Sequence, residues 1–221
     1  MTDFNMQTVQ TASGDSILAR NKVLRQTYIL LGMNVLFSAL CAYVGMHLNV
    51  QLPWFVALIG MFGLSFAIQA NRNSGLGIVF LFALTGLLGF YISHALNVYV
   101  SLGMGSVVVK ALVGSAIIFF GLSAYVLMSG KNFTFLGGFL FVGVLVAFLA
   151  GLGAMFFSMP ALSVVVSAAF LLIFSGYVLY DTSNIIHGEE TNYITATLNL
   201  FMNIFNIFVS LLNLLGVFNN D

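Results

Sequence analysis

The stretch that decides the fold of this chain runs from Ser175 to Asn206 and reads SGYVLYDTSNIIHGEETNYITATLNLFMNIFN. It ends one long apolar segment at Asp181, passes through a short polar loop, and enters a last apolar segment that contains regularly spaced asparagines. The chain has only six acidic residues, and Asp181 is the one that lies inside or at the edge of a long apolar segment. An ionisable group in such a place is costly and usually marks a functional site.

The asparagines of the last apolar segment fall on one face of a helix. At about 100° per residue, the polar positions between residues 192 and 213 lie within an arc of roughly 80°. This polar stripe consists of Asn192, Thr195, Asn199, Asn203, Asn206, Ser210 and Asn213. Because hydrocarbon offers an amide no hydrogen-bond partner, the stripe must face other helices or water, whereas the remaining faces suit lipid.

The preceding helix carries a matching polar face. The same count places Ser163, Ser167, Phe170, Phe174 and Tyr177 on the side of Asp181. We therefore expect the last two helices to turn their polar faces toward each other inside a bundle.

The composition places the chain among membrane proteins. Hydrophobic residues make up 61% of the 221 positions and charged residues 5%, against about 45–50% and about 25% in soluble domains. The predicted fold class is therefore all-α, as a polytopic membrane protein. The net charge is zero and no basic patch is present, which argues against a nucleic-acid partner. The single cysteine, Cys41, lies in an apolar segment and supports neither a disulfide framework nor a thiolate metal site.

Seven apolar segments are long enough to cross a bilayer as helices. They lie near residues 27–47, 53–70, 75–96, 106–129, 134–157, 160–181 and 195–217. The breaks between them are short, so residues 27–221 are predicted to form one seven-transmembrane-helix bundle with antiparallel neighbours. Residues 1–26 are polar and are predicted to form a mobile arm on the cytoplasmic side.

The distribution of Lys and Arg predicts the orientation, because positive loops face the cytoplasm. With the N-terminus inside, Arg20, Lys22, Arg25, Arg72 and Lys131 fall on the cytoplasmic side, and Lys110 alone on the other. The odd number of spans then sends the C-terminus to the opposite, periplasmic side and the loop after Asp181 to the cytoplasm.

Catalytic chemistry has no clear signature in the sequence. His47, His94 and His187 lie near the ends of different apolar segments, without the i, i+4 pairing of a zinc-binding helix. Glycine loops that cradle phosphates or dinucleotides are also missing from the sequence. We therefore predict no catalytic residue, no resident cofactor and no enzyme activity.

Asp181 has two interpretations. As a structural residue, it would accept a hydrogen bond from Tyr177 or from the polar stripe and hold the last two helices in register. As a functional residue, it would form a Ca²⁺ or H⁺ site at the cytoplasmic mouth of a path between these helices, because hard cations select carboxylate and amide oxygens. The polar stripe is open to the same two interpretations. Glu189 and Glu190 form either a solvated loop or a group that gathers cations near this mouth.

Several longer motifs resemble the Bax inhibitor-1 family of transmembrane proteins. They are FTFLGG at Phe133–Gly138, GYVLYDTSNIIHG at Gly176–Gly188 and NIFNIFVSLLNLLG ending at Gly216. The segments SLGMGSVVVKAL, MPAL at Met159–Leu162 and TSNIIHGEETNYI are similar to the YccA-type branch of Gram-negative bacteria. The resemblance covers the chain after about residue 20.

The resemblance implies a seven-helix inner-membrane protein that binds the membrane-anchored AAA protease FtsH and restrains its degradation of other membrane proteins. Other bacterial members of the family are pH-sensitive calcium leak channels that use a pair of aspartates on the last two helices. The first aspartate corresponds to Asp181, whereas the second corresponds to Asn203. Two close carboxylates share a proton, which an Asp and an Asn cannot do, so we expect weaker calcium binding and a softer pH response. The family's gating arginine is matched to Arg72.

Overall fold

The computed structural model describes residues 3–219, and every element assigned within this range is a helix. The helices are α1 (Asp3–His47), α2 (Trp54–Ala70), α3 (Gly75–Ser101), α4 (Gly105–Ser129), the short 3-10 helix η1 (Thr134–Leu136), α5 (Gly137–Phe156), α6 (Pro160–His187) and α7 (Tyr193–Phe218). Within the described residues, six helices are long and apolar enough to cross a membrane, and α2, with 17 residues, is shorter. The predicted all-helical polytopic membrane bundle is thereby confirmed.

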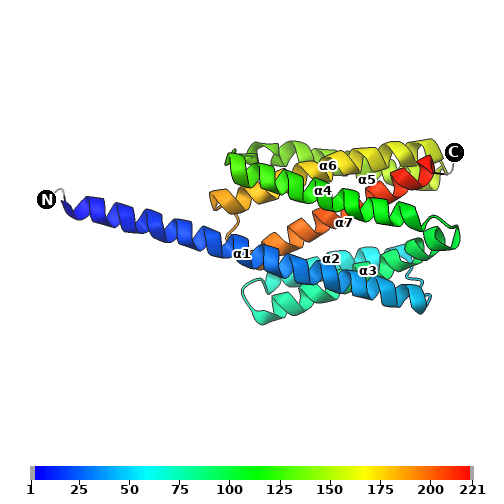
Figure 1. Cartoon of the computed structure of the whole chain (residues 1–221), viewed down its shortest axis with the longest axis horizontal. Coiled ribbons are helices and arrows are strands. Elements are labelled where there is room, and N and C mark those ends of the chain that lie inside the picture. The colour runs from blue at the N-terminus through cyan, green and yellow to red at the C-terminus, as the bar shows by residue number, and fades with distance from the viewer. Residues whose placement is uncertain (1–2, 220–221) are drawn as a thin grey trace.

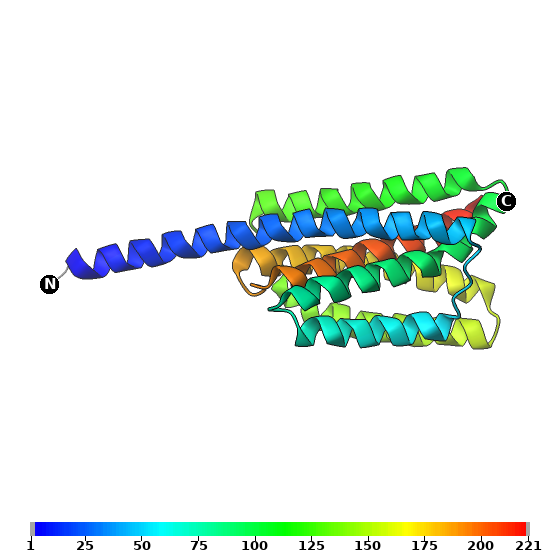
Figure 2. The same cartoon turned by 90° about the horizontal axis from the view of Figure 1, so that it is seen from below.

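The bundle consists of two groups of helices with α7 between them (Figures 1 and 2). Helices α1, α2 and α3 pack together on one side, and α4, α5 and α6 on the other, while α7 contacts both groups. Leu200, Ile207 and Leu212 of α7 are buried. These apolar faces, which by composition suit lipid, therefore lie in the core at these residues. Because α7 is enclosed by other helices on several sides, its apolar faces form core contacts instead.

The N-terminal part of α1 extends well beyond the other helices (Figure 1). The predicted mobile arm, residues 1–26, is therefore helical from Asp3 onward, although helical structure does not by itself exclude mobility. Isolated helices are only marginally stable in water unless they pack against something. Mobility of this arm stays a prediction.

Two helices continue past the ends that the sequence indicated. Helix α3 runs on to Ser101, because the side chain of Asn97 donates hydrogen bonds to the Met46 carbonyl (2.8 Å) and to Asn49 Oδ1 (3.0 Å). Asn97 therefore ties α3 to the end of α1 instead of ending the helix. Helix α6 continues past Asp181 to His187 and ends where Gly188 adopts a φ of +78°, a backbone conformation that favours glycine.

Hydrogen bonds join three loops at one end of the bundle. The Asn192 side chain donates to the Arg72 carbonyl (2.8 Å), which links the α6–α7 loop to the α2–α3 loop. The Phe133 amide donates to Ser183 Oγ (2.9 Å), which links the α4–α5 loop to the end of α6. These are the loops that the charge pattern places together on one side of the membrane.

Candidate functional site

Asp181 of α6 and Asn203 of α7 meet directly inside the bundle. Asn203 Nδ2 donates a hydrogen bond of 2.6 Å to Asp181 Oδ2. The two residues are only 6% and 3% exposed, respectively. The prediction that the polar faces of the last two helices turn toward each other therefore agrees with the observed geometry. The bond is also the contact expected of an aspartate that holds these helices in register.

The surroundings of Asp181 are polar and buried. Thr182, the next residue, is fully buried, and its hydroxyl lies 3.4 Å from the hydroxyl of Ser123 on α4. One turn further along α6, the side-chain oxygen of Asn184 is buried without a hydrogen-bond partner. Oxygen atoms of three kinds are thus concentrated where α6 approaches the predicted cytoplasmic end.

A cation at this position would depend on neutral oxygens. Among the described residues, no three His, Cys, Asp or Glu side chains lie close enough together to hold a metal ion. Calcium takes 6–8 oxygen ligands, whereas Asp181 brings one carboxyl group that already accepts the bond from Asn203. The other ligands would have to be amide, hydroxyl or carbonyl oxygens.

The predicted gate, Arg72, lies in the turn between α2 and α3 and is exposed. Its carbonyl accepts the bond from Asn192, and none of the hydrogen bonds of the described residues joins its side chain to Asp181. Arg72 and Asp181 therefore share one end of the bundle without touching. A gating role for Arg72 stays a prediction.

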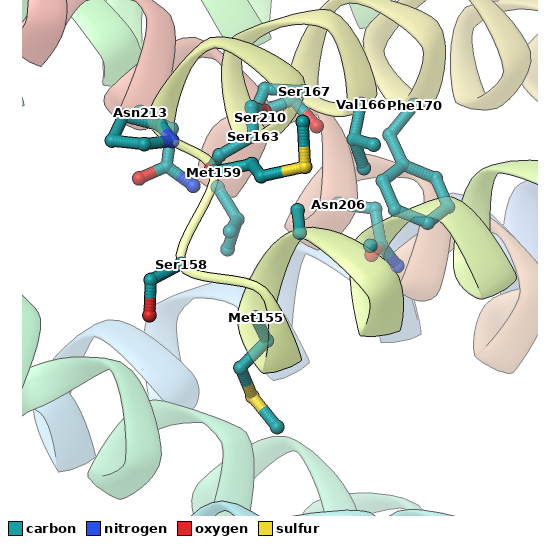
Figure 3. A pocket seen from close by; sticks show the side chains of 14 residues that line it. Met155, Ser158, Met159, Ser163, Val166, Ser167, Phe170, Asn206, Ser210 and Asn213 are labelled. Carbon is teal, nitrogen blue, oxygen red and sulfur yellow. The ribbon is translucent and has the colours of Figure 1, made fainter.

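A cavity of about 560 Å³ gathers most of the remaining predicted site residues (Figure 3). It lies between α5, α6, their connecting loop and α7, toward the end of the bundle that carries the C-terminus. Its polar lining residues are Ser158, Ser163, Ser167, Asn206, Ser210 and Asn213. None of the described residues that line it is charged, so this cavity offers hydroxyl and amide groups only.

The polar groups of this cavity are partly satisfied within their own helices. Asn206 Nδ2 donates to the Met202 carbonyl (2.8 Å), and Ser167 Oγ donates to the Ser163 carbonyl (2.9 Å). These bonds follow the i−4 pattern by which polar side chains are accommodated inside membrane helices.

A column of aromatic rings on α6 separates the cavity from Asp181. Phe170 lines the cavity and stacks on Phe174 with the ring centroids 5.8 Å apart, and Phe174 contacts Tyr177 at 6.0 Å. Phe174, Tyr177 and Asn203 do not line the cavity. The two polar regions predicted as one face are therefore separate in this structure, because bulky rings fill the space between them.

Three members of the polar stripe lie outside both regions. Thr195 lies near the start of α7, where its hydroxyl donates to Gln69 Oε1 of α2 (3.5 Å). Asn199 is half-buried and does not line the cavity. Asn192 is the N-cap of α7, and its side-chain oxygen accepts from the amides of Ile194 (3.0 Å) and Thr195 (3.2 Å). The polar stripe predicted from the sequence includes Asn192, but this residue caps α7 from outside the helix and so is not part of its polar face.

Residues from other segments, which the pattern of the last two helices does not indicate, also contribute to these regions. Ser158 of the α5–α6 loop and Gly151 and Met155 of α5 complete the cavity. Ser183 Oγ donates a hydrogen bond of 3.5 Å to Asn132 Oδ1, which fixes the α4–α5 loop next to the end of α6. No periodicity in one helix could reveal these contacts, since they join segments distant in the sequence.

Comparison with known proteins agrees with the resemblance seen in the motifs. Residues 20–220 match the family described as "Inhibitor of apoptosis-promoting Bax1". The chain is 45% identical over 219 residues to the Escherichia coli K12 protein named "Modulator of FtsH protease YccA", covering 98% of this chain and 100% of that protein. The same identity and coverage hold for an E. coli O6:H1 protein named "Inner membrane protein YccA". An uncharacterized membrane protein of Vibrio cholerae is 39% identical over 217 residues, 96% of each chain.

The names of these relatives describe a protease modulator and membrane proteins. The family match extends over nearly all of the helical bundle and includes Asp181, Asn203 and the lining of the cavity. On the strength of this match and of the full-length relatives, the chain belongs to the Bax inhibitor-1 family.

Proposed function

We propose that this chain is an inner-membrane protein that binds the membrane-anchored protease FtsH and restrains its degradation of other membrane proteins. The observation that carries the proposal is the 45% identity, over 98% of this chain, to a protein named as a modulator of that protease. Identity over the whole length includes the helices that would contact a partner in the bilayer.

The proposed topology has seven membrane crossings, with the N-terminus in the cytoplasm and the C-terminus in the periplasm. Helix α2 counts as the additional crossing, because 17 residues are at the lower limit for a spanning helix. The basic residues of the α2–α3 and α4–α5 loops, Arg72 and Lys131, favour this orientation.

Binding would occur through the sides of the helices. Helices associate within a bilayer by close packing and by interhelical hydrogen bonds, since lipid provides no hydrophobic driving force between them. Helix α5 is the most suitable candidate surface, because a Cβ at its glycines Gly138 and Gly153 would meet no atom within 4 Å, which leaves room for a partner helix to approach closely. In the structure α5 packs on α6 and η1, which leaves much of its surface to lipid or to a partner.

The direct test is co-purification of the tagged full-length chain from membranes in a mild detergent, followed by identification of the proteins that accompany it. We expect the protease among them, and at higher yield than with an unrelated tagged polytopic protein expressed at the same level. Equal yields from both samples would refute the proposal.

The N-terminal arm is proposed as the segment by which the protease grips this chain. An ATP-driven protease requires an end that unfolds readily, and the part of α1 that projects from the bundle meets this need (Figure 2). Deleting residues 2–18 should lengthen the lifetime of the protein in cells that contain the protease. As a control, replacing this segment by a polar sequence of equal length should restore rapid turnover; an unchanged lifetime after the deletion would contradict the proposed role.

A second candidate function, a cation or proton leak, rests on the buried Asp181–Asn203 pair. Vesicles that contain the purified protein should pass calcium, Asp181→Asn should change the flux, and Asn203→Asp should make its pH dependence steeper because two close carboxylates share a proton. Flux no greater than that of empty vesicles would eliminate this function and leave the proposed protease binding intact.

A further inference from the structure

A second cavity, of about 530 Å³, lies between α1 and α4. Along the described residues the backbones of α1 and α4 do not approach each other closely, and α7 packs against both helices. The floor of this α1–α4 groove is formed by buried residues, among them Leu31, Phe119, Phe201 and Phe208. At one end, the ring centroids of Tyr28 and Phe119 are 6.2 Å apart, and these two rings narrow the groove.

The chemistry of the groove suits a hydrocarbon chain. Its lining consists almost entirely of aliphatic and aromatic side chains. One of its few polar groups, the hydroxyl of Ser115, donates to the Ala111 carbonyl of its own helix. A water molecule needs two to four polar partners, which this lining does not offer, so an apolar occupant is favoured.

The rims of the groove determine what kind of apolar occupant fits. Leu36 and Tyr43 on α1 are 73% and 62% exposed, and Phe120 on α4 is 62% exposed. Close approach of a partner helix requires small residues along the contact, whereas these large side chains would hold a helix away from the floor. A thin, flexible acyl chain can pass between them.

A positive charge lies just beyond the narrowed end. Arg25 is exposed and precedes Tyr28 by three residues and Gly32 by seven, so it shares the helix face of both groove residues. At 1.5 Å per residue, it lies roughly 5 Å along the axis from Tyr28. If the acyl chain of a lipid occupied the groove, the phosphate of that lipid would lie at the level of Arg25. Basic side chains beside lipid-binding grooves bind anionic head groups.

We propose that the α1–α4 groove is a binding site for an anionic phospholipid, with one acyl chain against α7 and the phosphate paired with Arg25. The site is separate from the Asp181–Asn203 pair and does not depend on the proposed interaction with the protease. It would attach a lipid of the leaflet on the Arg25 side, at the base of the projecting arm of α1.

Two variants separate the chain-binding and the head-group parts of this site. Gly32→Leu places a side chain in the groove, and it should fold, because a Cβ at Gly32 meets no atom within 4 Å and leucine is a better helix former than glycine. The matched control is Gly63→Leu on α2, where a Cβ also meets nothing within 4 Å and which does not line the groove. For the head group, Arg25→Gln is compared with Arg72→Gln, another exposed arginine at the same end of the bundle.

The measurement is native mass spectrometry of the delipidated full-length protein after incubation with phosphatidylglycerol or phosphatidylethanolamine of identical acyl chains. We expect the unmodified protein to retain one phosphatidylglycerol tightly. Gly32→Leu should lose this lipid, whereas Gly63→Leu should keep it. Arg25→Gln should show a roughly fivefold weaker preference for phosphatidylglycerol over phosphatidylethanolamine, whereas the preference of Arg72→Gln should not change. Retention by Gly32→Leu equal to that of Gly63→Leu would overturn the proposal. So would an unchanged preference in Arg25→Gln, or a Gly32→Leu variant that keeps its lipid but no longer co-purifies with a partner protein.

Discussion

The Asp181–Asn203 hydrogen bond permits a quantitative test of how α6 and α7 are held together. The test is a double-mutant cycle of Asp181→Ala, Asn203→Ala and the double variant, which isolates the interaction between the two side chains. The bond is short, at 2.6 Å, and both residues are almost completely buried.

Two known magnitudes bracket the expected coupling free energy. Hydrogen bonds between membrane helices average about 0.6 kcal/mol and reach about 1.7 kcal/mol in such cycles, whereas bonds to charged groups in proteins contribute about 1.5–3 kcal/mol. Because the acceptor is a carboxyl group and solvent hardly reaches it, we expect about 1.5 kcal/mol, near the point where these ranges meet. At low pH the coupling should fall, since a neutral carboxyl group is a weaker acceptor than a carboxylate.

The assay is reversible unfolding in mixed micelles with increasing dodecyl sulfate, followed by far-ultraviolet circular dichroism. The matched control is the cycle of Asp181→Ala with Asn206→Ala, because Asn206 lies on the same face of α7 but donates to its own helix at Met202. That cycle should be additive within about 0.5 kcal/mol. Additivity in the Asp181–Asn203 cycle as well would refute the reasoning that this bond holds the helices in register.

Three further substitutions test contacts that position the site. Asn192→Ala should cost about 1–2 kcal/mol of unfolding free energy, measured in the same assay, because it removes the cap of α7 and the bond to the α2–α3 loop; a change below 0.3 kcal/mol would contradict the capping role. Gly89→Leu should cost about 1–3 kcal/mol, because a Cβ there overlaps the Ser38 carbonyl of α1, whereas Gly63→Leu should be tolerated. Ser183→Ala should speed amide hydrogen exchange at Phe133, whose N–H loses its acceptor, and unchanged exchange would show that another group satisfies this amide.

Part of the site could be predicted from the sequence because a helix has a fixed period. The 3.6-residue repeat places Asn203 and Asn206 on one face of α7 and Ser163 and Ser167 on one face of α6, whatever else the chain does. Since an amide is costly to expose to hydrocarbon, the sequence predicts that both faces turn toward the inside of the protein. The structure agrees in the bond from Asn203 to Asp181 and in the shared cavity.

The ends of helices were predicted less well, and the reason is the same at α3 and α6. The predicted spans end before Asn97 and at Asp181. Asn97 instead donates to the end of α1 and to Asn49 in the loop after it, and Ser183 accepts from Phe133 of the α4–α5 loop, so both residues stay within their helices. Whether an asparagine ends a helix or joins it to another depends on what lies beside it, and that information is not local.

By itself the sequence determined that this chain is a bundle of membrane helices and that the polar faces of the last two helices point inward, because hydropathy, segment length and helical period can be read from one segment at a time. The tertiary structure alone decided that α7 lies at the centre, that Phe174 and Tyr177 separate the cavity from Asp181, and that α1 and α4 leave a groove between them. The physical reason is that helix pairing in a bilayer depends on the fit between particular residues of different helices, such as Gly89 of α3 against the Ser38 carbonyl of α1. The hydropathy of a single segment does not contain this information.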